Sequence, residues 1–377
     1  MKFIPYGKQF IKEDDINAVV ETLKSDFLTT GPKIKEFEDA LSSYCGAKYV
    51  VAVSNGTAAL HLASLVLLNK DDKVLTTPNS FLATSNSILY VQAKPVFVDI
   101  STDGNIDLDL CEKKLKKDSS IKAIYVVHFS GNIVNQEKLE YLRTTYNIKI
   151  LEDCAHSLGA IQNKIKAASC TNSDISILSF HPVKNITTGE GGAITTNCKE
   201  IYEKLLILRN HGMTSNKQIA PWHYDMNELG FNYRLTDISC ALGLSQLKKL
   251  DSFLSSRRTI AKKYDETFQS IDKISPLYPF TQKSAYHLYV IKIDFTNLSI
   301  NKKDFVLKMR EKEIGLQFHY IPINKQPYYK NLGYGSENTP IMDEHYEKAI
   351  SLPIYPLLSN DEQDYVIKSI LEIINNA

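Results

Sequence analysis

The chain has 377 residues, of which 43% are hydrophobic and 23% are charged. This ordinary globular composition excludes a disordered chain, and the length suits two domains, or one large domain with a smaller one attached. Lys and Arg number 44 and Asp and Glu number 43, a net charge of +1, so the charge gives no reason to expect nucleic acid or a membrane as a partner.

The sequence carries no signal for export or membrane insertion. Its start, MKFIPYGKQFIKEDD, lacks the apolar stretch of a signal peptide, and no window approaches the ~20 apolar residues of a membrane span. We therefore expect a soluble, cytoplasmic protein. Its six cysteines are scattered, without a Cys-x-x-Cys pair or a histidine at ligand spacing, which predicts reduced thiols and no metal site.

The first part of the chain alternates helical patterns with short apolar runs. Residues 13–24 show helical spacing, and after the loop SDFLTTGP a second helix is predicted to begin at Pro32. Seven apolar runs follow, at residues 49–54, 73–77, 95–100, 123–129, 148–153, 175–180 and 192–197. Buried runs that alternate with helices indicate an α/β fold with a largely parallel sheet, and such sheets bind ligands at the carboxyl ends of their strands.

The pattern changes near residue 240. Residues 240–268 predict one long helix or two in line, residues 286–295 a strand, residues 302–314 an amphipathic helix, residues 315–323 another strand and residues 361–376 a terminal helix. We therefore expect a large α/β domain of residues 1–250 and a smaller α+β domain of residues 251–377.

Gly56 and Thr57 lie where an apolar run ends and a helix begins, in the segment SNGTAALHLA. Free N–H groups, a hydroxyl and the helix dipole at such a position favour an anion. Alternatively Ser54, Asn55 or Thr57 simply caps the helix, which is the commoner use of this composition.

An acid ends the fifth apolar run and a histidine follows it, in the segment ILEDCAHSLGA. Asp153 ends the run and His156 comes three residues later. If the ligand at this edge is a pyridine ring, Asp153 can keep the ring nitrogen protonated and His156 can orient the ring or its oxygen. Taken alone, an acid at a strand end is more often a cap or part of a salt bridge.

Lys184 is the sharpest single signal. It lies five residues after Ser179, which closes an apolar run, and just before the Gly-rich stretch GEGGAITT. A lone lysine is usually a solvated surface residue, but one held among closely packed backbone can lose its proton and form a Schiff base. An anion-binding helix start, a strand-end Asp and then Ser-x-x-x-x-Lys, in this order, are together typical of a pyridoxal phosphate site.

The whole chain resembles the DegT/DnrJ/EryC1/StrS family of sugar aminotransferases, which are fold-type I pyridoxal phosphate enzymes. The stretches that carry the resemblance include IPYGKQ, SDFLTTGP, TTPNSFLATSN, SFHPVKNITTGEGGA, LGFNYRLTD and FHYIPINKQPYY. The resemblance implies that Lys184 holds the cofactor and shuttles protons, that Asp153 pairs with the pyridinium nitrogen and that His156 lies near the ring oxygen. Relatives with histidine in place of this lysine are sugar dehydratases, and Lys184 disfavours that activity.

The resemblance also implies the remaining binding residues. Phe81 is expected to stack on the ring, unless it is an ordinary core residue, and Gly56, Thr57 and Ser179 are expected to bind the phosphate. Asn232 is expected to reach the cofactor phosphate or the substrate in the neighbouring subunit, which implies a homodimer with shared active sites. The expected nucleotide-sugar contacts, unless these positions are purely structural, are Tyr6, Asp26, Phe27, Leu28, Thr29, His181, Asn232, Gln317, Phe318, His319 and Tyr320.

Within the family, the same stretches most resemble the enzymes of pseudaminic acid biosynthesis. The implied reaction transfers an amino group from glutamate to C4 of a UDP-linked 4-keto-6-deoxy-N-acetylhexosamine, UDP-2-acetamido-2,6-dideoxy-β-L-arabino-hex-4-ulose. One alternative is amination of a different nucleotide-linked keto-sugar, at C3 or with other stereochemistry at C4. Another is a non-catalytic regulator that binds pyridoxal phosphate, which is disfavoured because the chain has no appended helix-turn-helix region and no basic stripe.

Overall fold

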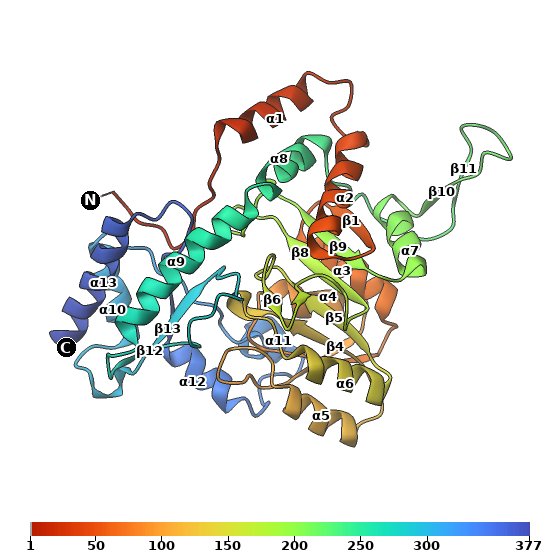
Figure 1. Ribbon diagram of the computed structural model, residues 1–377. Coiled ribbons are helices and arrows are strands. Elements are labelled where there is room, and N and C mark those ends of the chain that lie inside the picture. Colours follow the sequence, from red (N-terminus) through yellow and green to blue (C-terminus); the bar gives the residue numbers. More distant parts are fainter. Residues whose placement is uncertain (1) are drawn as a thin grey trace.

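A seven-stranded sheet forms the centre of the computed structural model, which describes residues 2–377 (Figure 1). Its strands stand in the order β1-β9-β8-β5-β4-β2-β3, and all run parallel except β9, which is antiparallel to both neighbours. The strands are β1 (Tyr49–Val53), β2 (Lys73–Thr76), β3 (Lys94–Phe97), β4 (Ile121–Val127), β5 (Lys149–Asp153), β8 (Ile175–Ser179) and β9 (Gly192–Thr196). They coincide with the seven predicted runs, which confirms the α/β fold with a mostly parallel sheet.

Helices cover both faces of this sheet because its strands are apolar on both sides. On one face, alternate residues such as Val51 and Ala123 pack against α3, α4 and α7, and on the other face Val50 and Ile124 pack against α2, α5, α6 and α8. The helices are α1 (Glu13–Leu23), α2 (Pro32–Cys45), α3 (Gly56–Leu67), α4 (Leu82–Tyr90), α5 (Leu108–Lys117), α6 (Gln136–Tyr146), α7 (Lys199–Arg209) and α8 (Asp237–Leu247).

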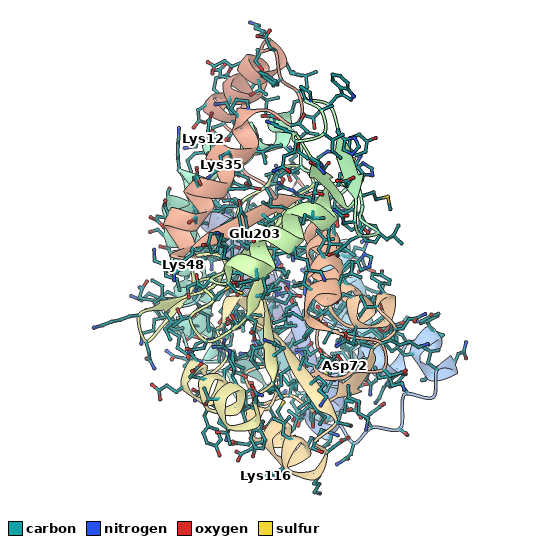
Figure 2. All side chains as sticks on the ribbon, turned by 90° about the vertical axis from the view of Figure 1, so that its right-hand side faces the viewer. Lys12, Lys35, Lys48, Asp72, Lys116 and Glu203 are labelled. Carbon is teal, nitrogen blue, oxygen red and sulfur yellow. The ribbon has the colours of Figure 1, made fainter. Side chains whose placement is uncertain are left out.

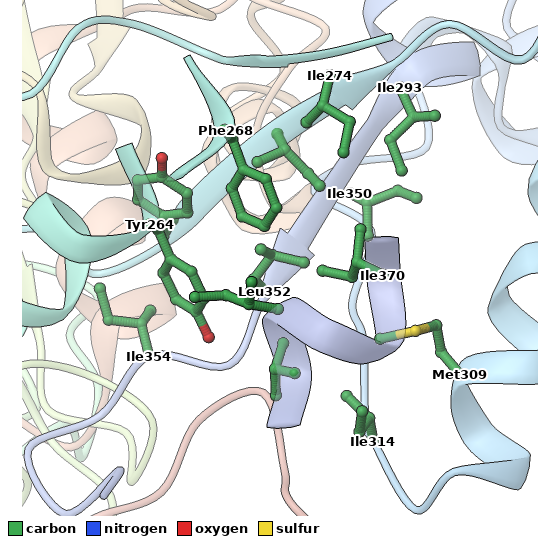
Figure 3. Packing of buried hydrophobic residues seen from close by; sticks show 14 of the residues in the cluster. Tyr264, Phe268, Ile274, Ile293, Met309, Ile314, Ile350, Leu352, Ile354 and Ile370 are labelled. Atoms are coloured by element: carbon green, nitrogen blue, oxygen red, sulfur yellow. The ribbon is translucent and has the colours of Figure 1, made fainter. Parts of the chain in front are cut away.

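A second, three-stranded antiparallel sheet lies in the C-terminal part of the chain. Its strands are β12 (Ile274–Pro276), β13 (Tyr289–Ile293) and β14 (Ala349–Leu352), and it packs against α9 (Leu250–Phe268), α10 (Lys302–Glu311) and α13 (Asn360–Asn375). Figure 3 shows this core, in which Tyr264, Phe268, Leu352 and Ile370 meet. Residues 240–268 therefore form two successive helices, α8 and α9, one of the two predicted arrangements.

Two observations bear on the predicted boundary at residue 250. Helix α9 starts there and packs against the large sheet through Phe253 and Leu254, whereas its later residues belong to the core of the small sheet. Ile4, from the opposite end of the chain, also packs in that core and bridges to Ile314. The boundary itself stays a prediction.

The strand predicted over residues 315–323 is wrong. This segment makes a single bridge, between Gln317 and Ser351 of β14, and then leaves the sheet for the short 3-10 helix η3 (Ile323–Lys325). Its alternating apolar residues imitate a strand, but Pro322 has no N–H to donate to a ladder and the preceding side chains line a cavity. Tertiary contacts therefore override the local pattern.

The remaining elements connect these two sheets or extend from them. They are the hairpin strands β6 (Ile161–Gln162) and β7 (Ile165–Lys166), the hairpin strands β10 (Met213–Ser215) and β11 (Tyr224–Met226), helices α11 (Pro327–Asn331) and α12 (Pro340–Lys348), and the 3-10 helices η1 (Phe129–Gly131) and η2 (Phe295–Asn297). The β10–β11 hairpin projects from the rest of the chain (Figure 1).

Charged side chains of both signs are spread over the molecular surface. Figure 2 labels Lys12, Lys35, Lys48, Asp72, Lys116 and Glu203 on one side of the molecule, where they come from different elements. This distribution agrees with the net charge of +1. In residues 2–377, no helix has both the length and the apolar character that are needed to cross a membrane.

Candidate active site

A cavity of about 790 Å³ opens at the carboxyl edge of the seven-stranded sheet. Most of the predicted site residues line it, although they come from segments distributed between residues 6 and 320. These residues are Tyr6, Gly56, Thr57, Phe81, Asp153, His156, Ser179, His181, Lys184, Gln317, Phe318, His319 and Tyr320. The fold thus assembles one cavity from the strand ends, the starts of two helices and the irregular segment before η3.

Asp153 forms part of the cavity wall as the last residue of β5, next to Val127 of β4 in the parallel register. Its side chain is buried, and both carboxylate oxygens accept hydrogen bonds: Oδ2 from the hydroxyl of Thr84 at 2.7 Å and Oδ1 from the backbone N–H of Ala155 at 3.1 Å. Burial raises the pKa of Asp153, while these two bonds and the charge of Lys184 oppose the rise. A cationic partner in the cavity would stabilise the carboxylate.

Lys184 lies in the turn after β8, where its backbone N–H donates to the carbonyl oxygen of His181 at 2.8 Å. The residue is only partly exposed and lines the cavity. Desolvation lowers the pKa of Lys184 from 10.5 to about 8, against the opposing charge of Asp153. A large fraction of this amine is therefore neutral, and hence nucleophilic, in mildly alkaline solution.

The start of α3 faces the same cavity. Asn55 caps the helix, because its Oδ1 accepts from the N–H of Ala58 at 2.8 Å, which confirms one of the predicted capping residues. The first N–H groups of the helix, at Gly56 and Thr57, lie ahead of any intrahelical acceptor, and both residues line the cavity. The site therefore combines a capped helix with a helix start whose free N–H groups face the cavity.

Two glycines allow β8 and β9 to approach this helix start closely. A Cβ on Gly56 would lie 3.1 Å from the Cβ of Ser179, and a Cβ on Gly192 would lie 2.6 Å from the carbonyl carbon of Asn55. Side chains at these positions would fill the space between the helix start and the hydroxyl of Ser179. The sequence leaves a small polar cradle there.

Histidines form another part of the cavity wall. His156 Nε2 lies 3.0 Å from the hydroxyl of Tyr320, and the His156 ring lies against the His287 ring with centroids 4.3 Å apart. Burial and the charge of Lys184 hold the pKa of His156 well below its usual value, and burial lowers that of His319 to about 3. These rings are therefore neutral near pH 7. The Nδ1 atom of His156 is buried and has no hydrogen-bond partner among the described residues.

Phe81 lies at the N-terminal end of α4 and is 61% exposed, so its interpretation as an ordinary core residue is wrong. Its ring lines the cavity with a centroid 6.4 Å from that of Tyr320. Tyr6 and His319 form a further aromatic pair on the wall, with centroids 5.8 Å apart. An aromatic wall of this kind suits a flat ring or a sugar face.

Five predicted residues do not line the cavity of their own chain. Asp26, Phe27, Leu28 and Thr29 form an exposed loop between α1 and α2, and Asn232 is exposed near the base of the β10–β11 hairpin. The loop is tied to the start of α8 by a bridge between Thr29 and Thr236. The role of Asn232 in a neighbouring subunit stays a prediction.

Other cavity residues were not predicted as site residues: Asn55, Thr84, Glu190, Tyr233 and His287. Thr84 had a usable signal, because it follows Phe81 by three residues at a helix start, which places both side chains on one face. Glu190 and Tyr233 stand within motifs that already pointed to the site. His287 had no signal, since the strand-like pattern around it says nothing about its contact with His156.

The sheet topology and this cavity are those of a pyridoxal-phosphate-dependent aminotransferase, as comparisons with known proteins show. The putative sugar aminotransferase Spr1654 of Streptococcus pneumoniae, solved in its PLP form, superposes with a TM-score of 0.90 at 30% identity, covering 99% of both chains. The sequence profile of the DegT/DnrJ/EryC1/StrS aminotransferase family matches residues 9–371, and the chain belongs to this family.

Two further relatives carry more specific names. The UDP-4-amino-4,6-dideoxy-N-acetyl-beta-L-altrosamine transaminase of Campylobacter jejuni strain 81-176 is 40% identical over 376 residues, which cover 99% of this chain and 98% of the relative. Helicobacter pylori PseC, described as an aminotransferase involved in the biosynthesis of pseudoaminic acid, superposes with a TM-score of 0.93 at 32% identity over the whole of both chains.

Proposed function

We propose that this protein transfers an amino group from glutamate to C4 of UDP-2-acetamido-2,6-dideoxy-β-L-arabino-hex-4-ulose, a step of pseudaminic acid biosynthesis. The observation that carries the proposal is the meeting of Lys184, Asp153 and the start of α3 in one cavity with an aromatic and histidine-lined wall. The sugar is supported by the names of the Campylobacter and Helicobacter relatives. The protein acts in the cytoplasm, where nucleotide-activated sugars are made.

The cavity fits pyridoxal phosphate on observations of this chain alone. The buried carboxylate of Asp153 needs a cationic partner, which a protonated pyridine nitrogen supplies. The buried Nδ1 of His156 has no partner among the described residues and needs a polar one, which the ring oxygen would supply. Gly56, Thr57 and Ser179 form a cradle of N–H and hydroxyl donors for the phosphate. Phe81, which lines the cavity, would cover one face of the ring.

Lys184 is the residue that binds the cofactor covalently and transfers protons in the proposed mechanism. When bound, pyridoxal phosphate supplies an aldehyde that takes up the amino group and a ring that accepts electrons. The lowered pKa of Lys184 makes a neutral amine available to hold that aldehyde and, once released, to move a proton to and from the reacting carbon. Asp153 supports both half-reactions because its negative charge keeps the ring nitrogen protonated.

The neutral histidines and the aromatic wall suit the sugar substrate. Near pH 7, His156, His287 and His319 offer hydrogen bonds without charge, because burial lowers the pKa of each. The nucleotide-sugar is bound by Tyr6, His181 and the segment from Gln317 to Tyr320. The loop from Asp26 to Thr29, which lies outside the cavity of its own chain, contacts the nucleotide.

The functional unit is a homodimer with shared active sites, in which Asn232 serves the cavity of the other subunit. The exposed position of Asn232 outside its own cavity supports this assignment. Each subunit consists of a cofactor-binding domain of residues 1–250 and a smaller domain of residues 251–377, with the cavity lined from both.

Absorbance spectroscopy on the purified full-length protein tests the reaction. With pyridoxal phosphate added, we expect a band of lysine-bound cofactor that glutamate converts to the pyridoxamine form. The β-L-arabino keto-sugar should then restore the first band, with a 4-amino sugar detected by mass spectrometry. If a 3-keto sugar or a sugar of other stereochemistry at C4 is preferred, the sugar assignment is wrong. If no cofactor binds and glutamate has no effect, the chain is not the enzyme proposed.

Mixed dimers test the shared sites. A heterodimer of one Lys184→Ala subunit and one Asn232→Ala subunit, isolated with two affinity tags, keeps one complete site if Asn232 acts across the interface. Its activity should then approach half that of the wild-type dimer, although both parent homodimers are impaired. A heterodimer no more active than its parents would show that Asn232 serves its own subunit or none, and a monomer in light scattering would remove the shared site altogether.

A further inference from the structure

We propose that Thr84 is a positioning residue for Asp153: its hydroxyl fixes the carboxylate and keeps the proton shared with the cofactor ring on the ring nitrogen. The inference rests on the proposed role of Asp153 and deepens it. It assigns a function to a residue of α4 that donates a hydrogen bond to the carboxylate and that was not among the predicted site residues.

The hydrogen bond from Thr84 to Asp153 is short and shielded from water. Thr84 Oγ1 donates to Asp153 Oδ2 at 2.7 Å, and the two residues are 1% and 5% exposed. The other oxygen, Oδ1, accepts from the backbone N–H of Ala155 at 3.1 Å. With a separate donor on each oxygen, the carboxyl group cannot rotate without losing a buried hydrogen bond.

A chain of buried hydroxyls holds Thr84 in place. Its carbonyl oxygen accepts from Ser87 Oγ at 2.8 Å, Ser64 Oγ of α3 donates to Ser87 Oγ at 3.2 Å, and Ser64 Oγ lies 3.1 Å from the hydroxyl of Tyr125 of β4. Helix α4 is thereby tied to α3 and to the sheet beneath the cavity. Phe81, three residues before Thr84, lies at the start of the same helix, so one element positions both the ring-covering side chain and the donor to Asp153.

The hydroxyl matters because it sets how strongly Asp153 competes for a proton. Burial makes this carboxylate more basic, and the hydrogen bond from Thr84 is the foremost influence in the opposite direction. Without the hydroxyl, the shared proton would move from the ring nitrogen towards Asp153. The ring would then accept electrons less well, and the pairing that retains the cofactor would weaken.

The test compares Thr84→Val, which removes the hydroxyl at nearly constant shape, with Thr84→Ser, which keeps it. For Thr84→Val we expect pyridoxal phosphate affinity and the rate of the glutamate half-reaction each to fall about tenfold to a hundredfold, and the pH titration of the bound cofactor's absorbance to shift. Thr84→Ser should stay within about threefold of wild type. Ser87→Ala is the matched control, because it removes a hydroxyl from the same buried chain while the Thr84 hydroxyl stays beside Asp153; it should lower the melting temperature and shift the titration much less than Thr84→Val does.

The outcomes separate this inference from the proposed function. A folded Thr84→Val protein with wild-type cofactor affinity, titration and half-reaction would overturn the inference while the proposed function stood. Equal shifts in Ser87→Ala and Thr84→Val would show that Thr84 acts only through packing. Wild-type protein that binds no cofactor would reject the proposed function first. If Thr84→Val does not fold, Thr84→Ala carries the same comparison, since it introduces no methyl group beside the carboxylate.

Discussion

The cavity wall and the core of the small sheet both contain buried side chains, but they differ in whether the buried polar atoms have hydrogen-bond partners. In the small-sheet core, the Tyr264 hydroxyl donates to the carbonyl oxygen of Pro353 and the Gln363 amide donates to that of Ile260, with the Tyr289 hydroxyl as an exception. In the cavity wall, His156 and His287 each bury an Nδ1 atom that has no partner among the described residues.

An unpaired buried polar atom costs about 1–3 kcal/mol of stability. The small-sheet core gains stability from apolar contacts at Phe268, Ile350 and Ile370, whereas the cavity wall keeps buried polar atoms that have no partner among the described residues. Chemistry and stability are therefore concentrated in separate regions. Substitutions in the cavity should change catalysis with little effect on folding, and substitutions in the core should do the reverse.

The largest effect is expected for Lys184→Ala. Turnover should fall by at least about a thousandfold, because in the proposed mechanism the Lys184 amine both holds the cofactor and moves the proton. The melting temperature of the apoprotein should stay close to that of wild type, since the lost group is a desolvated amine and not a packing residue. Steady-state assays measure the turnover, and calorimetry measures the melting temperature. Substantial residual turnover would contradict the assignment of Lys184.

Ile370→Ala probes the other region. Ile370 is fully buried in the small-sheet core (Figure 3), and a truncation of this kind costs about 2–5 kcal/mol of unfolding free energy. The turnover number per folded molecule should stay unchanged. Denaturant unfolding measures the loss of unfolding free energy. Leu371→Ala, at a partly buried neighbouring position, is the control and should lower the unfolding free energy by less. A loss of turnover in the folded fraction would break the separation between the two regions.

The pH dependence of cofactor capture tests the electrostatics of the cavity. Only the neutral amine of Lys184 attacks the aldehyde, so the capture rate of the apoenzyme should rise with pH through a midpoint near 8. The negative charge of Asp153 raises the pKa of Lys184, so Asp153→Asn should move the midpoint to lower pH. Stopped-flow absorbance provides the rates. Asp71→Asn, at an exposed site, is the control. If the pH midpoint in Asp153→Asn is unchanged or higher, the charge of Asp153 does not raise the pKa of Lys184.

The smallest effect is expected at a helix cap that does not line the cavity. Ser359 caps α13: its hydroxyl accepts from the N–H of Glu362 at 3.2 Å, and its own N–H donates to the Glu362 carboxylate at 2.9 Å. Ser359→Ala should lower the unfolding free energy by about 0.5–2 kcal/mol and leave catalysis unchanged. Asn360→Ala, one residue inside the helix, should lower the unfolding free energy by less. An equal loss of unfolding free energy at both positions would argue against the cap.

Much of the larger sheet could be predicted because its strands are local signals. Each strand is a short apolar run bounded by turn or helix residues, and buried parallel strands require that pattern whatever lies around them. The segment from residue 315 to 323 shows the limit of this reasoning. Its alternating residues suggest a strand, yet its side chains from Gln317 to Tyr320 line the cavity. Local periodicity does not distinguish a sheet strand from an irregular segment that lines a cavity.

The sequence by itself determined the fold class, and it placed Asp153 at the end of a strand and Lys184 in the turn that follows another strand, because strand pattern and residue chemistry are both local properties. Only the tertiary structure decided that Phe81 is exposed in a cavity, that His287 lies against His156 and that Thr84 donates to Asp153. The contact of His287 with His156 and the hydrogen bond from Thr84 to Asp153 each join segments that are far apart along the chain. Such contacts depend on how whole elements pack, and no local repeat of residues encodes that packing.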